Sequence, residues 1–329
     1  MTVAIIDGDV LAYMACESRY KNGQGYTIYQ LEEKVFTPEE DAAYLTKSWL
    51  RFQEIVKDLC ECCFTDQFKM AVKGEGNFRN DIYPEYKANR HADPTKRNPF
   101  VPQLRQMAVD TGIATAAHGM EADDLLRIWQ QECVKNGEDY VICSIDKDLR
   151  CIPGRHYVMN KNDFITMEEH ESIRFYYEQL LKGDPTDNIK GIPKVGEVRA
   201  RKYLEQYGTE AEFQYVVTEA YQGAFGNDWH DELMLNGRLL YLKKSFDDEF
   251  TMDGWNTCSY EEQETVEKIV LIECEKPNLS AVELVEKFNE LANLITNVTI
   301  PETPQVHAGQ GTPTEIPVWN PAWSKGKRG

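Results

Sequence analysis

The chain has 329 residues, of which 42% are hydrophobic, and its formal net charge is −19. This length and composition are typical of a globular protein with one large or two smaller domains. No apolar run approaches the ~20 residues of a membrane span, and the N-terminus lacks the basic start of a signal peptide, so we expect a cytoplasmic protein without membrane contact.

The chain contains 9 Cys at scattered positions. An odd number in a chain of this kind predicts reduced thiols rather than a disulfide framework. The one cluster, Cys60-Glu61-Cys62-Cys63, lacks a second Cys/His pair at the spacing of a zinc site. We interpret it as part of a buried helix face.

Strands alternate with helices over the first half of the chain. Hydrophobic periodicity predicts strands at residues 3–6, 68–72, 113–117, 140–144, 157–159 and 164–167. It predicts helices at residues 38–62, 104–112 and 122–136. Residues 78–102 are polar, basic and aromatic without apolar period, which favours a long functional loop. The alternation indicates an α/β fold with a mainly parallel sheet, in which ligands bind beyond the carboxyl ends of the strands.

The second half is predicted to be helical. Helices are expected at residues 171–182, 198–207, 225–250, 265–272 and 281–297. The first two flank a glycine-rich turn, Gly183 to Gly196, and the free N–H groups that begin the second helix suit phosphate binding. From Thr299 the chain is rich in Pro, Gly and Thr and is expected to be a disordered tail.

Carboxylates recur where predicted strands and turns end. The clusters are Asp7/Asp9, Glu121-Ala122-Asp123-Asp124, Asp146/Asp148 and Asp184/Asp187. Each alone is typical of a capped turn or of an acidic first helical turn. Together they favour one shared site, because so many carboxylates coexist as anions only beside cations. Oxygen ligands suit Mg²⁺ or Mn²⁺, and two such ions form the usual clamp for hydrolysis of a phosphodiester.

The charge of one segment is reversed against this acidic background. Between Arg79 and Arg105 basic residues outnumber acidic ones. Lys87 and Arg90 are therefore predicted to neutralise substrate phosphates that the acidic site would repel.

The order of motifs resembles the flap endonuclease/5′→3′ exonuclease family, and phage-encoded 5′-exonucleases in particular. The residues that carry the resemblance are Ile6-Asp7-Gly8, Phe78-Arg79, Pro84-Glu85-Tyr86-Lys87-Ala88-Asn89-Arg90, Glu121-Ala122-Asp123-Asp124, Ser144-Ile145-Asp146-Lys147-Asp148 and the run from Gly183 to Ile192. The resemblance implies a PIN-like α/β nuclease domain with a helix–three-turn–helix element and a helical C-terminal region. It implies a catalytic domain over residues 1–170 with an arch at 78–103, a duplex-binding and helical region at 171–298, and a tail at 299–329.

The family's functional residues carry over by position. Two ions, Mg²⁺ or Mn²⁺, would be held directly or through water by Asp7, Glu121, Asp123, Asp124, Asp146, Asp148, Asp184 and Asp187, with Glu75 as a candidate further ligand. Catalytic positive charge would come from Lys87 and Arg90, with Lys73 as a further candidate. Substrate contacts would come from Arg79, Tyr86, Asn89, Gly191, Lys194 and Gly196, with K⁺ as an expected further ion at the helix–three-turn–helix.

One position departs from the family pattern. Relatives often carry an Asp just after the second strand, where this chain reads Val72-Lys73-Gly74-Glu75. Either Glu75 substitutes for it, or the ligand is missing, or Lys73 supplies a positive charge to the scissile phosphate.

The resemblance implies a structure-dependent 5′→3′ exonuclease or flap endonuclease acting in replication, repair or host DNA degradation. Its substrates would be DNA 5′ ends, flaps and nicked or intact duplexes, with RNA–DNA hybrids as a further class. If the protein is phage-encoded, it would act in the host cytoplasm. One alternative is a catalytically weakened, structure-specific DNA-binding protein. Another is a PIN-type ribonuclease, which the Gly183 to Gly196 turn disfavours. The tail either docks onto a replication protein through Trp319 and Trp323 or is a solubilising remnant.

Overall fold

The computed structural model describes residues 2–17, 37–91, 98 and 100–255, except the side chains of Arg90 and His91. All of these residues belong to one compact unit of the chain, Met1–Thr257. The predicted helices at residues 265–272 and 281–297, and the predicted tail, lie outside the described residues.

A six-stranded sheet with strand order β3-β2-β1-β4-β5-β6 forms the centre of the fold. Its strands are β1 (Thr2–Asp7), β2 (Phe68–Lys73), β3 (Thr115–Ala117), β4 (Asp139–Ser144), β5 (Gly154–Val158) and β6 (Asp163–Met167). All neighbouring pairs are parallel except β5 and β6. The carboxyl ends of β1, β2 and β4 therefore meet at one edge, because parallel neighbours end on the same side.

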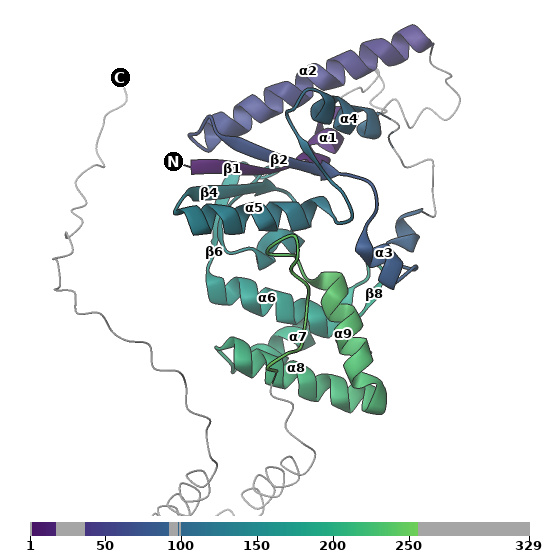
Figure 1. Cartoon of the computed structure of the whole chain (residues 1–329), viewed down its shortest axis with the longest axis vertical. Helices are drawn as coiled ribbons and strands as arrows, with labels where there is room; N and C mark the ends of the chain where they lie inside the picture. The colour runs from purple at the N-terminus through teal and green to yellow at the C-terminus, as the bar shows by residue number, and fades with distance from the viewer. Residues whose placement is uncertain (1, 18–36, 92–97, 99, 256–329) are drawn as a thin grey trace, which may run out of the picture. The chain divides into compact units, whose positions relative to one another are not determined.

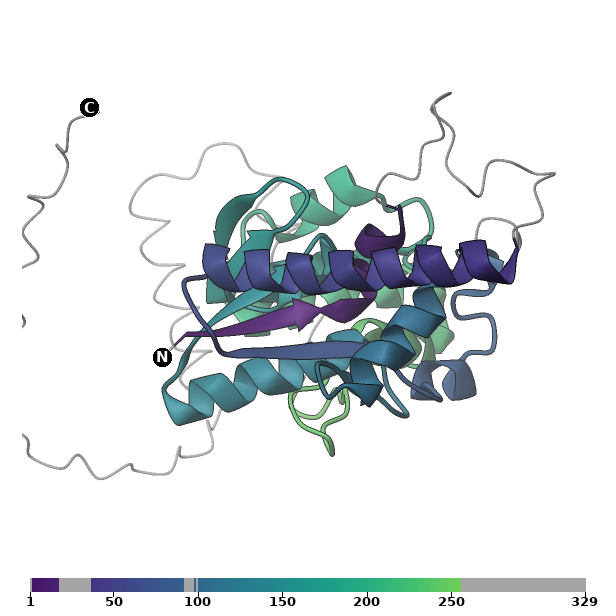
Figure 2. The same cartoon turned by 90° about the horizontal axis from the view of Figure 1, so that it is seen from above.

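Helices cover both faces of this sheet (Figures 1 and 2). One face packs against α1 (Gly8–Glu17), α2 (Pro38–Cys62) and α4 (Val101–Asp110). The other packs against α5 (Ala122–Asn136). The side chains of β1 alternate between the two cores, Ala4 and Ile6 on the first side and Ile5 on the second. A strand buried on both faces must be apolar throughout, which explains the uninterrupted run before Asp7.

A second helical layer lies below α5 in Figure 1. It contains α6 (Glu169–Lys182), α7 (Glu197–Leu204), α8 (Glu210–Phe225) and α9 (Trp229–Leu240), which share one apolar core. Between α6 and α7 the chain forms a two-stranded ladder of β7 (Gly183–Asp184) and β8 (Ile189–Lys190). The prediction of two helices on either side of the glycine-rich turn is therefore confirmed by α6 and α7.

Most predicted elements are confirmed within one to three residues, and the fold class is confirmed. Two differ. The segment expected as a loop contains a short helix, α3 (Phe78–Ile82), and the 3-10 helix η2 (Ala88–His91). The predicted helix at residues 225–250 is wrong: α8 ends at Phe225, the 3-10 helix η5 (Gly226–Asp228) follows, and α9 ends at Leu240. Gly226 has φ +56°, a conformation that favours glycine and interrupts the helix.

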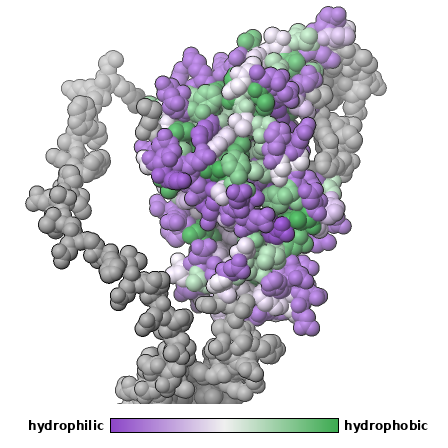
Figure 3. Space-filling model, viewed as in Figure 1, coloured by the Kyte–Doolittle hydropathy of each residue, from purple (hydrophilic) through white to green (hydrophobic). Residues whose placement is uncertain are grey.

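The surface view in Figure 3 shows mostly hydrophilic residues, with hydrophobic ones in small patches between them. Among the described helices, none is both long and apolar enough to cross a bilayer. Seven Cys residues fall in the described part of the chain, and all seven are free thiols: Cys16, Cys60, Cys62, Cys63, Cys133, Cys143 and Cys151. Of the predicted cluster, Cys63 is buried, while Cys60 and Cys62 are half-buried.

Candidate metal centre

The carboxyl ends of β1 and β4 bring two of the predicted acids together. Asp7 ends β1 and is only 3% exposed. Its Oδ1 accepts the N–H of Val10 at 3.1 Å, and its Oδ2 accepts the Ser144 hydroxyl at 2.7 Å. The same Ser144 oxygen accepts the N–H of Asp146 at 2.9 Å. Ser144 therefore joins Asp7 to the start of the loop that carries Asp146.

Asp123, in the first turn of α5, is a third acid near Asp7 and Asp146. Burial and then the charge of Asp9 raise the pKa of Asp7 to about 6. Burial and then the charges of Asp7, Glu121 and Asp146 raise the pKa of Asp123 well above its usual value. The charge of Asp123 thus interacts with those of Asp7, Glu121 and Asp146, which indicates that these acids lie near one another at the carboxyl end of the sheet.

The turn after α6 extends this cluster from the helical layer. Asp148 begins the 3-10 helix η4 (Asp148–Cys151), and its Oδ1 accepts an N–H of Gln179 at 2.9 Å. Burial, then Asp146 and Asp184, raise the pKa of Asp148 to about 6. Asp184 lies in β7, and its Oδ1 accepts the N–H of Thr186 at 2.8 Å. Asp148 thus lies between the acids of the sheet and those of the helix–turn–helix.

Tyr86 and Lys87 bridge Glu121 and Asp187. The Tyr86 hydroxyl lies 3.1 Å from Glu121 Oε2 and 3.2 Å from Asp187 Oδ2, and it can donate to either. Lys87 Nζ lies 2.5 Å from Glu121 Oε1 and 3.4 Å from Asp187 Oδ2. Burial raises the pKa of Glu121, but Lys87 and Arg79 outweigh this effect and lower it below its usual value. Lys87 has φ +56°, a strained conformation for a lysine, which the bond from its N–H to Asp187 O (2.9 Å) helps to hold.

The surroundings of Asp124 differ from those of the other predicted ligands. It is 0% exposed, and Arg79 binds both of its oxygens, at 2.6 and 2.9 Å. The same carboxylate accepts the N–H groups of Glu121 and Lys243. A carboxylate held by four donors has no oxygen left for a metal, so its geometry argues for a structural role.

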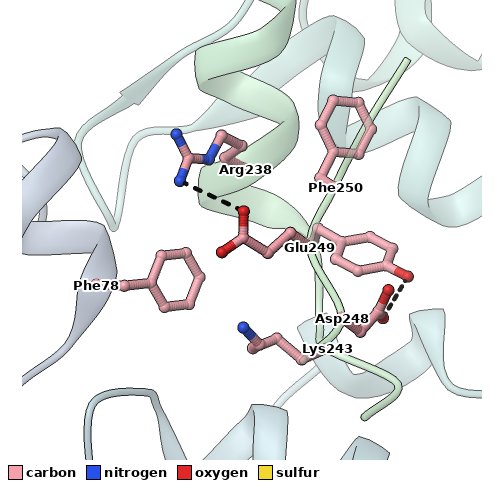
Figure 4. A pocket seen from close by; sticks show the side chains of 7 residues that line it. Phe78, Arg238, Lys243, Asp248, Glu249 and Phe250 are labelled. Atoms are coloured by element: carbon pink, nitrogen blue, oxygen red, sulfur yellow. Dashed lines mark hydrogen bonds and ion pairs between the residues drawn. The ribbon is translucent and has the colours of Figure 1, made fainter. Parts of the chain in front are cut away.

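Arg79 extends this junction to the end of α9. Its Nε donates to Leu239 O at 2.8 Å, and an Nη donates to Tyr241 O at 2.7 Å. The predicted substrate contact of Arg79 is therefore not supported by its position, because its side chain is only 1% exposed. Beside it is a small pocket lined by Phe78, Arg238, Tyr241, Lys243, Asp248, Glu249 and Phe250 (Figure 4). Lys243 and Arg79 lie over the Phe78 ring, so this pocket belongs to the junction.

The remaining predicted residues are distributed around this centre. Asn89 donates to Pro185 O at 2.8 Å and so ties η2 to the β7–β8 turn. A Cβ at Gly191 would lie 2.2 Å from Gly183 N, so this glycine is required for close packing. Gly196 is the N-cap of α7 with open space around it, and Lys194 has φ +64°. Lys73, the last residue of β2, and Glu75, two residues later, are both exposed, and the side chain of Arg90 is outside the described part.

The donor set suits a hard divalent cation. It consists of carboxylate oxygens, and Asp7 and Asp123 are buried with raised pKa values, so a nearby cation would relieve their repulsion. In their present rotamers, no three His, Cys, Asp or Glu side chains of the described residues enclose a single metal position. Instead, the Lys87 ammonium neutralises Glu121 and Asp187. The residues therefore fit a divalent metal centre in the chemistry of their donor atoms.

Two residues of this centre were missed as site residues from the sequence, and a third, Asp9, was recognised in the Asp7/Asp9 cluster but not as a candidate ligand. Ser144 and Gln179 orient Asp7 and Asp148. Asp9 lies close enough to Asp7 to raise its pKa. The Asp7-Gly8-Asp9 spacing signals Asp9, since it follows directly after a buried strand. Gln179 carries no such signal, because only the packing of α6 brings it to the sheet.

Comparisons with known proteins identify relatives of this chain. Residues 2–178 match the family model described as "5'-3' exonuclease, N-terminal resolvase-like domain". The chain is 36% identical over 141 residues to the 5′-3′ exonuclease of Buchnera aphidicola subsp. Schizaphis graminum, which covers 40% of this chain and 49% of that relative. It is 32% identical over 227 residues to DNA polymerase I of Chloroflexus aurantiacus, covering 62% of this chain and 22% of the polymerase. The matched region thus spans about half, or less, of these relatives.

Among solved structures, the chain is similar to the T5 D15 protein co-crystallized with metal ions. The TM-score is 0.50 with 16% sequence identity, and the match covers 74% of this chain and 89% of the other. At this identity, the likeness concerns the fold alone.

Proposed function

Since this chain belongs to the 5′-3′ exonuclease family with an N-terminal resolvase-like domain, we propose that it is a metal-dependent nuclease that hydrolyses phosphodiesters at or near DNA 5′ ends. The observation that carries the proposal is the meeting of acids from β1, α5, the β4 loop and β7 beside Tyr86 and Lys87. The fold shared with a protein co-crystallized with metal ions supports the same reading.

In this proposal the acids hold the ions and the bases hold the substrate. Asp7, Glu121, Asp123, Asp146, Asp148, Asp184 and Asp187 would bind two divalent cations, Mg²⁺ or Mn²⁺. When bound, these cations neutralise the carboxylates and stabilise the charge that develops on the phosphate oxygens during hydrolysis. Lys87 would exchange its carboxylate partners for a substrate phosphate, as charge complementarity requires. Asp124 and Arg79 are left out of this set because they saturate one another.

The helix–turn–helix would hold the duplex part of the substrate. Gly196 begins α7 in open space, so the free N–H groups of that helix can face phosphates. Lys190 and Lys194 lie in or beside the same turn. We further propose that the chain is divided into a catalytic domain at residues 1–170, a duplex-binding and helical region at 171–298, and a tail at 299–329. A K⁺ ion would bind at the turn before α7, and RNA–DNA hybrids would be a second class of substrate. The protein would act in the cytoplasm, and the tail would bind a replication protein.

Three 5′-labelled substrates test the proposed activity: a 5′ flap, a nicked duplex and a blunt duplex, each with Mg²⁺ and with EDTA. We expect Mg²⁺-dependent release of 5′-terminal products, and the relative rates divide exonuclease from flap endonuclease activity. Tight duplex binding without cleavage of any substrate would instead favour the catalytically weakened DNA-binding protein.

The raised pKa values predict how pH and metal act on stability. Asp7 and Asp148 have folded pKa values of about 6, above the 3.8 of an unperturbed Asp, so protonation favours the folded state. Their stabilising contribution is complete below pH ~4 and is lost as the pH rises through ~6. In EDTA at pH 7.5, the buried charge of Asp7 should therefore cost about 3 kcal/mol of folding stability relative to the protonated form, or roughly 6–12 °C in Tm.

A divalent cation should restore this stability at pH 7.5 but much less at pH 5, where protons compete for the same oxygens. Thermal melts with Mn²⁺ and with EDTA at both pH values measure the difference. Asp7→Asn should reduce the response to Mn²⁺ at pH 7.5. An equal gain in Tm at both pH values would contradict the assignment of Asp7.

A further inference from the structure

The first carboxylate after β2 belongs to Glu75, two residues past Lys73, the last residue of the strand. Glu75 is exposed, its N–H lies 3.3 Å from His118 Nδ1, and its carbonyl accepts the N–H of Gly119 at 2.8 Å. These contacts tie the backbone of Glu75 to the segment after β3, which is the edge strand of the sheet and the neighbour of β2 on the side away from β1. The reason lies at Gly74, where a Cβ would be 2.2 Å from Ala117 O, so the chain leaves β2 pressed against β3.

The carboxylate of Asp9, not that of Glu75, contacts the last residue of β2. Its Oδ1 accepts the N–H of Lys73, the last residue of β2, at 2.9 Å. Gly8 makes this approach feasible, because a Cβ there would lie 2.7 Å from Ala71 O and from Val72 Cγ1. The first turn of α1 therefore rests directly on β2. The Asp9 carboxylate is thus placed over the end of β2 although Asp9 belongs to the element after β1.

Asp9 is also held by a cation from α4. Arg105 Nε lies 2.7 Å from the same Oδ1, with side chains 17% and 27% exposed. Arg105 belongs to α4, which packs beside α1 (Figure 2), and its guanidinium lies 5.7 Å from the centre of the Tyr13 ring. The hydrogen bond and the closest ion-pair contact of Asp9 within the described residues are both made through Oδ1. Oδ1 is thus anchored, which leaves Oδ2 as the candidate donor to a cation.

From this arrangement we infer that Asp9 supplies the carboxylate that the β2 end lacks, and that it binds one of the two divalent cations through Oδ2. Arg105 is its counter-charge in the metal-free protein. Lys73 orients Asp9 through its backbone N–H, whereas Glu75 is not a ligand. The inference rests on the proposed function, since it names a further ligand of the same centre.

Mn²⁺ binding in the absence of DNA tests this assignment independently of activity. We would titrate the full-length protein with MnCl₂ and measure the number and affinity of sites by calorimetry and by the free Mn²⁺ signal in electron paramagnetic resonance. Asp9→Asn keeps an oxygen for the Lys73 N–H but removes the charge, and it should weaken one of two sites by at least about tenfold. Glu75→Gln is the matched control and should leave both affinities within about twofold of wild type.

Two further variants distinguish the loss of a metal ligand from a folding defect. Asp9→Glu keeps the charge and should weaken the site less than Asp9→Asn. Arg105→Met leaves Asp9 in place but removes a competing cation, so the same site should bind Mn²⁺ more tightly than in wild type. Thermal melts in EDTA would establish that each variant folds.

The outcomes separate this inference from the proposed function. If wild type binds two Mn²⁺ ions and Asp9→Asn binds them equally well, Asp9 is not a ligand and the inference is overturned. Loss of a site in Glu75→Gln instead would assign the ligand to Glu75 and overturn it as well. If wild type binds no Mn²⁺ at all, it is the proposed metal-dependent function that fails.

Discussion

Replacing Asp123 with Asn should lower Mg²⁺-dependent hydrolysis by about a thousandfold, because a ligand lost from a two-ion centre removes several kcal/mol of transition-state stabilisation. Asp123 interacts with the charges of Asp7, Glu121 and Asp146, acids that come from three different elements or loops. The rate on a 5′-labelled flap under single-turnover conditions is the measurement, with duplex affinity determined alongside in Ca²⁺ or EDTA.

The same variant should be more stable than wild type in EDTA. Since burial and neighbouring charges raise the pKa of Asp123, a neutral side chain at this position relieves repulsion in the folded state. A large loss of activity together with a higher Tm cannot result from misfolding. Cleavage at the wild-type rate would remove Asp123 from the centre, and equal losses of stability and activity would indicate a structural role instead.

Replacing Arg79 with Met should destabilise the protein by about 3–5 kcal/mol, because it leaves the buried Asp124 carboxylate without its partner. Arg79 and Asp124 are 1% and 0% exposed, and two bonds of 2.6 and 2.9 Å join them. The free energy of unfolding in urea without metal is the measurement. The double variant Arg79→Met/Asp124→Leu should recover part of the loss, since an apolar pair of similar volume leaves no buried charge.

Arg238→Met is the matched control for this prediction. Arg238 lies in α9 at the same junction (Figure 4), but its partner Glu249 is 4.0 Å away and their side chains are 35% and 66% exposed. An exposed pair of this kind contributes less than about 1 kcal/mol, so this variant should unfold almost like wild type. Similar losses in Arg79→Met and Arg238→Met would show that Arg79–Asp124 is not the main tie between α5, α3 and α9.

The elements were predictable where local patterns are strong. The predicted limits of α2 and α5 agree with the structure, since α2 begins with Thr37, Pro38 and Glu40 in a capping box and α5 ends at Gly137 with φ +67°. The segment from 225 to 250 was not, because α9 occupies only Trp229–Leu240 of it, and α8, which ends at Phe225, was not predicted. Phe250 packs against Gly237 and the ring of Tyr241, contacts that give an apolar pattern without a helix.

The sequence alone determined the alternation of strands and helices and the occurrence of acids at strand ends, because both follow from the spacing of residues near one another in the chain. It also carried the order of motifs that family membership bears out over residues 2–178. Only the tertiary structure decided which acids are available to a metal. Asp124 is saturated by Arg79, a residue 45 positions away, while Asp9 is placed over β2 by the close approach at Gly8. A carboxylate's charge and partners depend on the groups that folding brings around it, and the sequence neighbourhood does not contain them.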